Sequence, residues 1–260
     1  MGLFDQFRLD GKTALVTGAS RGLGRVMALA FAEAGADVII TGRHQDTLDK
    51  TAGEIRAHGR KASTLEADMG VPDQCEAAFH RLVKENGPIH ILVNNVGNRV
   101  TAEPIVEESL ASWQSAIDLN LTSCVLGTKI VGASMIERGE GGRIINISSM
   151  SGLIANRGIG GRSYETTKAA VSHFTRCAAA DWAPHKITVN AICPGLFMTD
   201  TNREWNEKKP EVIDAIVEGI PAGRPGEPDE LGPLAVYLAS PASAYMTGAA
   251  LVIDGGYTLW

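Results

Sequence analysis

A tyrosine and a lysine stand four residues apart in the segment Tyr164-Glu165-Thr166-Thr167-Lys168, at the start of an alanine-rich stretch. Residues at this spacing share one face of a helix, so the two side chains would be neighbours there. A tyrosine hydroxyl with a pKa of about 10 is a poor base at neutral pH, but an adjacent ammonium group favours its phenolate. Such a pair can take a proton from an alcohol oxygen or give one to a carbonyl oxygen. A buried tyrosine beside a solvated lysine gives the same spacing, so the pair alone decides nothing.

A serine cluster upstream supports the chemical interpretation. The buried run Arg143–Ser148 leads directly into Ser149 and Ser151. A serine at the end of such a strand can hydrogen-bond a substrate oxygen that is held against the Tyr164 hydroxyl.

A second constellation, Thr17-Gly18-Ala19-Ser20-Arg21-Gly22-Leu23-Gly24, lies between an apolar run and a helical pattern. Gly18 permits a sharp turn, Gly22 lets the backbone approach a pyrophosphate, and Gly24 lets the helix pack closely on the strand. The free N–H groups at the helix N-terminus attract the anion. A glycine-rich turn can be purely structural, but its position between strand and helix favours nucleotide binding.

Apolar, β-branched runs alternate with helical patterns along the chain. Most runs are continuously apolar, which indicates strands covered on both faces, and their regular alternation with helices indicates right-handed βαβ crossovers. We therefore expect an α/β fold, a single Rossmann-type domain over residues 1–260 with a doubly wound parallel sheet of about seven strands and helices on both faces. The expected strands are Thr13–Thr17, Asp37–Thr41, Ala62–Glu66, Ile89–Asn94, Arg143–Ser148, Ile187–Ala191 and Ala250–Asp254. The expected helices are Gly24–Ala34, Thr47–His58, Asp73–Glu85, Glu107–Arg138, Tyr164–Ala183 and Asp229–Ala239.

The least regular stretch is Phe197–Arg224, which we interpret as a loop and helix. It departs from Pro194-Gly195 at a strand end, which in an open parallel sheet faces the ligand crevice. We therefore expect a substrate lid at about residues 197–224. Its polar contacts and one flat apolar surface would come from Asp200, Thr201, Asn202, Arg203 and Trp205.

Composition excludes several other classes of function. The formal net charge of −6 argues against nucleic acid or an anionic membrane surface as the main partner. The four cysteines form no CxxC pair and the six histidines show no metal-ligand spacing, so we expect no metal site. The N-terminus lacks the apolar core of a signal peptide, and we find no apolar run of membrane-spanning length. We expect a cytoplasmic protein.

At this point the residues resemble a known family. From Leu9 to Tyr257 the chain is similar to the short-chain dehydrogenases/reductases, since the glycine pattern matches the family's TGxxxGxG. Further matching motifs follow in the correct order: Asn94-Asn95-Val96-Gly97, Asn190-Ala191-Ile192-Cys193-Pro194-Gly195, Gly223-Arg224-Pro225-Gly226-Glu227-Pro228 and Asp254-Gly255-Gly256.

The resemblance implies a catalytic tetrad of Asn120, Ser149, Tyr164 and Lys168. Tyr164 would be the general acid/base, Ser149 would position the oxygen, and Asn120 would anchor a proton-relay water. Lys168 would lower the pKa of Tyr164 and hold the nicotinamide ribose. Cofactor contacts are implied for Gly18, Ser20, Arg21, Gly22, Leu23, Gly24, Arg43, Asp68, Asn95, Gly97, Tyr164, Lys168, Pro194, Gly195 and Thr199. Among them, Asp68 would accept the adenine amino group, unless it only caps a strand end, and Thr199 would bond the carboxamide. A homotetramer is implied as well.

Two departures from the family pattern concern the site. Val96 stands where alanine is usual, which adds bulk beside the cofactor. The spacing from Ser149 to Tyr164 is longer than the commonest one, so the loop Leu153–Ser163 borders the substrate in an unpredicted conformation.

The choice of nicotinamide cofactor follows from charge. An NAD enzyme of this kind places a carboxylate after the second strand, whereas Asp37–Thr41 runs into Gly42-Arg43-His44. Arg43 and Arg21 could hold a 2′-phosphate, which favours NADP(H). Two solvated arginines or mixed NAD(H) use are the alternatives.

The leading functional hypothesis is an NADP(H)-dependent oxidoreductase for a secondary alcohol or its ketone, and the competing class is a catalytically silent nucleotide-binding or redox-sensing protein. Sugar acids and polyols, 3-oxoacyl thioesters, and alicyclic or steroid ketones all stay open as substrates. Asn156, Arg157 and Arg162 lie in the lengthened loop, where the two arginines could hold a carboxylate or phosphate. Solvated arginines, or arginines in a subunit contact, would fit the pattern equally well. A sugar acid such as gluconate is the first substrate to test.

Overall fold

Seven parallel strands form one sheet in the order β3-β2-β1-β4-β5-β6-β7, in a computed structural model that describes residues 2–259. The strands are β1 (Thr13–Val16), β2 (Asp37–Gly42), β3 (Ala62–Glu66), β4 (Ile91–Asn94), β5 (Gly142–Ile147), β6 (Ile187–Pro194) and β7 (Ala250–Ile253). The direction of chain progression reverses between β1 and β4, and ligands of such sheets bind at this switch point, beyond the carboxyl ends of the strands. The predicted doubly wound fold is confirmed.

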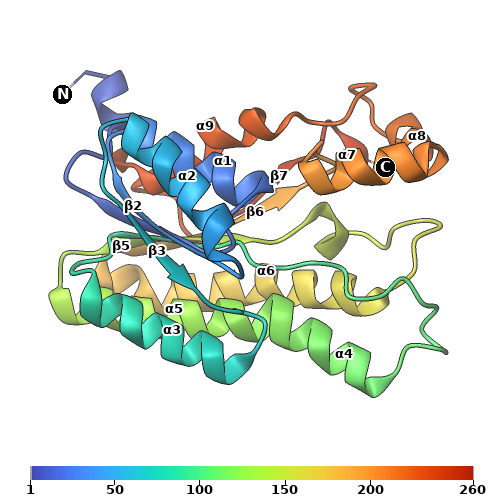
Figure 1. The fold of residues 1–260 in the computed structure, drawn as a ribbon, viewed down its shortest axis with the longest axis horizontal. Coiled ribbons are helices and arrows are strands. Elements are labelled where there is room, and N and C mark those ends of the chain that lie inside the picture. Colours follow the sequence, from blue (N-terminus) through green and yellow to red (C-terminus); the bar gives the residue numbers. More distant parts are fainter. Residues whose placement is uncertain (1, 260) are drawn as a thin grey trace.

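Two helical layers cover the sheet (Figure 1). The helices α1 (Gly22–Glu33), α2 (Gln45–Ala57) and α9 (Gly232–Ala239) lie on one face, and α3 (Pro72–Glu85), α5 (Ser123–Arg138) and α6 (Arg162–Trp182) lie on the other. Successive strand residues serve opposite faces: Ala14 and Val16 join the α1 side, while Leu15 joins the α3 side. Both faces of the strands are therefore buried, as the continuous apolar runs indicate.

The predicted helix Glu107–Arg138 is present but not uniform. It consists of α4 (Leu110–Ile117), a π-helical turn at Asp118–Thr122, and α5. The continuous helix Leu110–Arg138 is long and apolar enough to cross a membrane by length and composition alone, in contrast to our expectation from the sequence. Half of its most apolar window is buried, with α5 packed against α3 and β4, which is the environment of a core helix.

The stretch expected to be a loop and a helix forms two helices, α7 (Asp200–Lys208) and α8 (Pro210–Glu218). They break at Lys209, which adopts φ −147° and ψ 65° because a following proline disfavours helical geometry. Pro210 then begins α8, where its missing N–H costs no hydrogen bond. Figure 1 places both helices at the end of the molecule far from the N-terminus.

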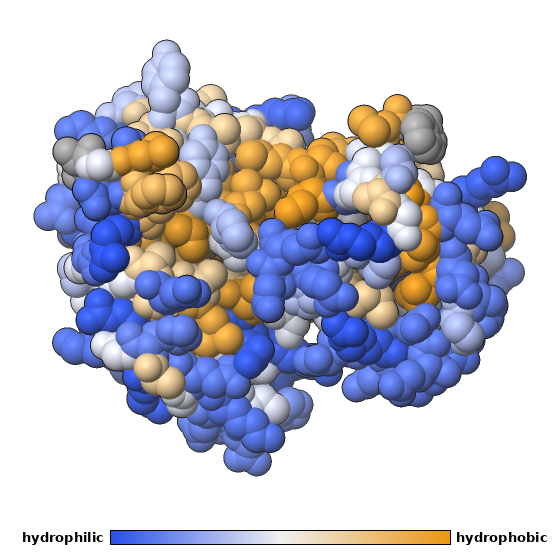
Figure 2. All heavy atoms as spheres, turned by 90° about the horizontal axis from the view of Figure 1, so that it is seen from above, coloured by the Kyte–Doolittle hydropathy of each residue, from blue (hydrophilic) through white to orange (hydrophobic). Residues whose placement is uncertain are grey.

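The face formed by α1, α2 and α9 is not uniformly polar. Figure 2, which views the molecule from this side, shows apolar atoms gathered in its middle and hydrophilic side chains around them. Apolar exposure of this kind is typical of a surface that contacts another molecule.

Candidate functional site

The glycine-rich turn after β1 adopts a conformation that needs glycine. Gly18 and Gly22 have φ values of +65° and +57°, which side chains with a Cβ atom rarely adopt. A Cβ atom on Gly24 would lie 2.5 Å from the Gly18 carbonyl oxygen, so α1 can start this close to the turn only without a side chain. The turn therefore presents backbone N–H groups at the N-terminus of α1, a fitting cradle for a pyrophosphate.

Asn95, directly after β4, holds this turn in place. Its amide donates to the carbonyl oxygens of Thr17 at 2.9 Å and Gly18 at 3.1 Å. Its backbone N–H donates to the Thr17 hydroxyl at 3.0 Å. Asn95 thus joins the two strand ends on either side of the switch point. Val96 meets the turn too, since a Cβ atom on Gly18 would lie 3.1 Å from Cγ2 of Val96.

The predicted contacts to the adenosine half of the cofactor lie at the ends of neighbouring strands. Arg21 follows β1 and Arg43 follows β2. Both side chains are exposed, so they are accessible to a phosphate group. Ser20 is half-buried against Gly42, and Leu23 packs against the core. Asp68 follows β3 and accepts a hydrogen bond from the Gly70 N–H at 2.9 Å. The capping role weighed for Asp68 is therefore present, and its side chain is half-buried.

Tyr164 and Ser149 lie together at the start of α6. Burial raises the pKa of the Tyr164 hydroxyl, and hydrogen bonding with Ser149 and the positive charge of Arg99 act in the opposite direction. The Ser149 hydroxyl also accepts the Ser151 N–H at 3.1 Å, which fixes its orientation.

Lys168 is buried, only 2% exposed, and its ammonium group donates to the Ile147 carbonyl oxygen at 2.8 Å. Burial lowers its pKa to about 8. Its Nζ lies 5.9 Å from the centre of the Tyr164 ring. Lys168 is therefore near Tyr164, as the spacing predicts, and its ammonium group lies over the tyrosine ring.

Asn120 reaches the same point from the π-helical turn. A Cβ atom on Gly97 would lie 2.7 Å from both Oδ1 of Asn120 and Nζ of Lys168, so the bare Gly97 backbone separates the two groups. The Asn120 amide holds the backbone of Asn98 at both ends, accepting its N–H at 2.9 Å and donating to its carbonyl at 3.0 Å. The structure thus brings all four predicted tetrad residues to one place at the strand ends.

Pro194 and Gly195, predicted to contact the cofactor, lie at the end of β6, and Thr199 directly precedes α7. A Cβ atom on Gly195 would meet Cα of Asp254 at 2.7 Å, so β6 ends in close contact with the segment after β7. The Thr199 hydroxyl caps α7, accepting the Asn202 N–H, and its methyl side faces Gly22. A hollow of about 220 Å³ lies beside Thr199, lined among others by Gly22, Arg25 and Asp200.

Several residues expected to face the substrate are occupied elsewhere. The Arg162 guanidinium pairs with Glu165 at 2.6 Å, and buried Asn156 donates to Glu165 at 2.9 Å and to the Ser151 hydroxyl at 2.8 Å. These contacts tie the lengthened loop to α6 and, through Ser151, to Ser149. Asn202 donates to the Phe197 carbonyl at 2.7 Å, and Arg203 pairs with Glu227 at 2.6 Å. Of the two loop arginines, only Arg157 is exposed.

Sequence reasoning missed Arg99, two residues after Gly97. Its guanidinium carbon lies 4.8 Å from the centre of the Tyr164 ring, closer than Lys168, and the group donates to the carbonyl oxygens of Gly160 and Gly161. The signal available in the sequence was its position directly after the strand-end motif that contains Gly97.

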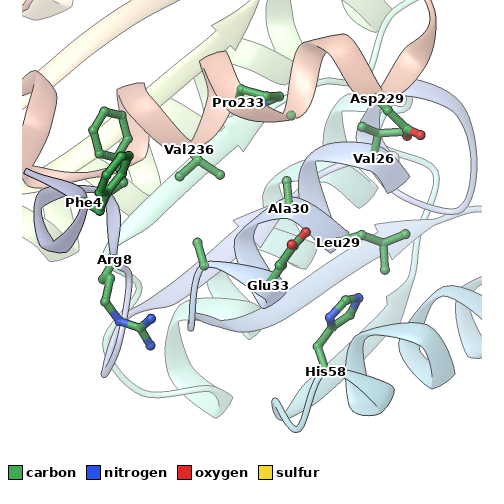
Figure 3. Close-up of a pocket in the computed structure, with 13 residues that line it drawn as sticks. Phe4, Arg8, Val26, Leu29, Ala30, Glu33, His58, Asp229, Pro233 and Val236 are labelled. Carbon is green, nitrogen blue, oxygen red and sulfur yellow. The ribbon is translucent and has the colours of Figure 1, made fainter.

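A larger hollow lies elsewhere. Figure 3 shows this hollow of about 730 Å³ between α1, α9 and the N-terminal turn Phe4–Phe7, with Phe4, Leu29 and Val236 on its wall. None of Asn120, Ser149, Tyr164 and Lys168 lines this hollow. The candidate site is therefore defined by the chemistry of its residues and not by cavity size.

Comparison with known proteins agrees with this placement. A family model described as Enoyl-(Acyl carrier protein) reductase matches residues 18–258. The chain is 38% identical to the galactitol 2-dehydrogenase (L-tagatose-forming) of Cereibacter sphaeroides, over 98% of each chain. It resembles a short-chain type dehydrogenase/reductase from Mycobacterium marinum with 42% identity and a TM-score of 0.92, over 99% of each chain. A gluconate 5-dehydrogenase from Burkholderia cenocepacia, solved in complex with NADP and tartrate, is 36% identical with a TM-score of 0.91 over the whole of both chains.

The chain therefore belongs to the short-chain dehydrogenase/reductase family. The similar members are dehydrogenases and oxidoreductases that act on CH–OH groups, so the chain is an oxidoreductase of this class. NADP is the cofactor found in several of the similar structures.

The burial of Lys168 predicts a stability gain when its charge is removed. Lowering the lysine pKa from 10.5 to about 8 corresponds to roughly 3 kcal/mol of destabilisation, and loss of the contact with the Ile147 carbonyl costs about 1–2 kcal/mol. Lys168→Met should therefore raise the free energy of unfolding of the cofactor-free protein by about 1–2 kcal/mol at pH 7. Urea unfolding measures this difference.

The gain should depend on pH in one direction. The folded lysine carries its unfavourable charge fully below pH 8, and the wild type recovers stability as the pH rises from about 8 to 10.5. The advantage of the variant should therefore disappear across that range. Lys84→Met, at an exposed position of α3, is the control and should change little. A Lys168→Met protein less stable than the wild type at pH 7 would contradict this account.

Proposed function

We propose that the protein is an NADP(H)-dependent dehydrogenase that interconverts a secondary alcohol of a small polyhydroxylated compound and its ketone. The observation that carries the proposal is the convergence of Asn120, Ser149, Tyr164 and Lys168 at the strand ends, beside the glycine-rich turn. An intact set of these four residues argues against a catalytically silent nucleotide-binding protein.

In this proposal Tyr164 exchanges a proton with the substrate oxygen, and Ser149 donates a hydrogen bond that positions the same oxygen. The nicotinamide cofactor, when bound, supplies or accepts the hydride at the adjacent carbon. Lys168 holds the nicotinamide ribose, and Asn120 anchors a water through which the Tyr164 proton is exchanged with solvent. The cluster Asn156, Glu165 and Arg162 keeps the loop around Ser149 in place.

The residues suit NADP(H) better than NAD(H). The glycine turn offers a cradle for the pyrophosphate, and exposed Arg43 follows β2 where an NAD enzyme carries an acid. Arg43 and Arg21 would bind the 2′-phosphate by charge-assisted hydrogen bonds. A cytoplasmic location, where NADP(H) is available, fits this choice.

For the substrate, the similar proteins include a galactitol dehydrogenase and a gluconate dehydrogenase. We infer a polyol or sugar acid as the substrate class and α7 and α8 as its lid, since Thr199, which caps α7, lies beside the glycine turn. The alternative is a 3-oxoacyl thioester reductase, because a 3-oxoacyl-[acyl-carrier-protein] reductase is also among the similar proteins. Arg162 is not a substrate ligand in this proposal, because Glu165 already neutralises it.

The function is tested by Tyr164→Phe, which keeps the ring and removes the exchangeable proton. Oxidation of galactitol and gluconate with NADP⁺, and reduction of an acetoacetyl thioester with NADPH, are followed at the absorption of the reduced cofactor. Turnover with the accepted substrate should fall by about 10² or more, while the affinity for NADP⁺ stays near the wild-type value. A variant that retains most of its turnover would remove Tyr164 from the proton transfer.

Cofactor choice is tested by Arg43→Ala. We expect KM for NADPH to rise by a factor that corresponds to about 1–3 kcal/mol, with KM for NADH almost unchanged, because only NADPH carries the 2′-phosphate. Lys84→Ala removes an exposed charge far from the strand ends and is the control. Equal losses with both cofactors would show that Arg43 does not contact the phosphate.

We also propose a homotetramer. Apolar side chains are exposed at and before the start of α4, with Leu110 87% and Val106 86% exposed, and at Val252 on the sheet-edge strand β7. Partner chains that cover both places would build a four-chain assembly. Sedimentation equilibrium should give a mass four times the 27.5 kDa of one chain. A mass of one chain would dispose of this assembly.

A further inference from the structure

The position of Arg99 is fixed from two sides. Its own backbone N–H donates to the Asn98 side chain at 2.8 Å, and Asn98 is held at its N–H and its carbonyl by Asn120. Its guanidinium group donates to the carbonyl oxygens of Gly160 and Gly161. A residue of the proposed tetrad and the lengthened loop therefore both orient this arginine.

The two glycines are needed for this contact. Gly161 has φ +75°, and its N–H donates to the Glu103 carbonyl at 2.9 Å. A Cβ atom on Gly161 or Gly160 would overlap the carbonyl oxygens of Thr101 and Ala102. Only glycine lets the loop lie this close to the segment that carries Arg99.

The guanidinium group lies over the ring of Tyr164, 4.8 Å from its centre, with its hydrogen bonds directed to backbone carbonyls. A cation over an aromatic face is attracted by the ring, and the attraction grows when the ring carries the negative charge of a phenolate. We propose that Arg99 is a second cation of the catalytic centre, one that stabilises the phenolate form of Tyr164 during proton transfer. The inference rests on the proposed function, in which Tyr164 is the general acid/base.

Lys168 does not make this second cation redundant. Burial lowers the pKa of Lys168 to about 8, so its charge is lost in the alkaline range where a tyrosine base ionises. Burial lowers the pKa of Arg99 as well, but an arginine starts from 12.5 and keeps its charge there. In the transfer itself the proton moves between the substrate hydroxyl and the Tyr164 oxygen, and Arg99 keeps all its protons.

The charged groups around this pair are few. Tyr164 faces Arg99 and Lys168, with the neutral hydroxyl of Ser149 beside it. Arg99 also lies in the field of Glu165, Arg162 and Glu108. Because Glu165 and Arg162 neutralise each other at 2.6 Å, the charge balance at the tyrosine depends mainly on Arg99 and Lys168.

The test measures Tyr164 ionisation directly, by ultraviolet difference titration of the protein with NADP⁺ bound. Subtracting the titration of Tyr164→Phe isolates this tyrosine from the other three. Arg99→Gln should raise the ionisation midpoint by about one pH unit, a tenfold loss of phenolate at a fixed pH. Arg99→Lys, which keeps the charge, should stay near the wild type, and Lys84→Gln is the matched control.

An unchanged midpoint in folded Arg99→Gln would overturn the proposal. So would an increase of a full unit in Arg99→Lys, which decides the question if the glutamine variant does not fold. This titration needs no substrate, so its result is separate from a failure of the wild type to oxidise any alcohol, which would overturn the proposed function alone.

Kinetics give a second readout with a neutral substrate, galactitol. In the direction of alcohol oxidation the acidic limb of the kcat–pH profile should move to higher pH in Arg99→Gln by the same amount as the midpoint, because phenolate is the active base. If the variant instead raised KM for gluconate alone and left the galactitol profile unchanged, Arg99 would be a ligand of the substrate carboxylate and the proposal would be wrong.

Discussion

Lys168 carries an ammonium group into the interior of the protein, and much of the candidate site is arranged around that charge. A buried cation loses its hydration and needs polar partners in fixed positions. Here one partner is the carbonyl oxygen of Ile147, the last residue of β5, so the sheet itself supplies it. The bare backbone of Gly97 leaves room for Asn120 on the other side. The position of the charge is thus a property of the whole sheet edge rather than of α6 alone.

A row of buried polar contacts fixes α6 against the sheet. Asn94 on β4 donates to Thr128 on α5 at 3.0 Å and to Asn146 on β5 at 2.9 Å, and Asn146 donates to Thr175 on α6 at 3.0 Å. Apolar packing tolerates small shifts of a helix along a sheet, whereas hydrogen bonds between buried groups define one register. Thr175 lies seven residues after Lys168, about two helical turns, so this register also sets the height of the ammonium group.

The fold was predictable from sequence because its signals are local. The apolar runs located all seven strands to within a few residues, and the glycine spacing located the turn after β1. The meeting of Asn120, Ser149, Tyr164 and Lys168 followed from family motifs.

The surroundings of these residues were not predictable. From the sequence Arg162 looked like a free cation, although Glu165 lies three residues later on the same helical face. The spacing does not show which of the two side chains turns inward. Arg99 reaches Tyr164 through contacts with Gly160 and Gly161, more than sixty positions away in the chain, and such pairing has no sequence period. The break between α7 and α8 had a visible cause in Pro210, and we missed the second helix.

The π-helical turn at Asp118–Thr122 is a helix with one residue too many for its length. A deletion of a single residue there would restore the ordinary hydrogen-bond pattern and give a more regular helix. Because the wider turn already absorbs the extra residue, the deletion would leave α4 and α5 on nearly the same faces and would mainly change the direction of the side chains within the turn. Asn120 could then no longer face both Asn98 and the gap at Gly97 while α5 kept its packing on α3. The irregularity therefore separates two demands on one continuous helix, a fixed core contact at one end and an asparagine aimed at the site in the middle, and a sequence better suited to helix formation would be worse suited to this chemistry.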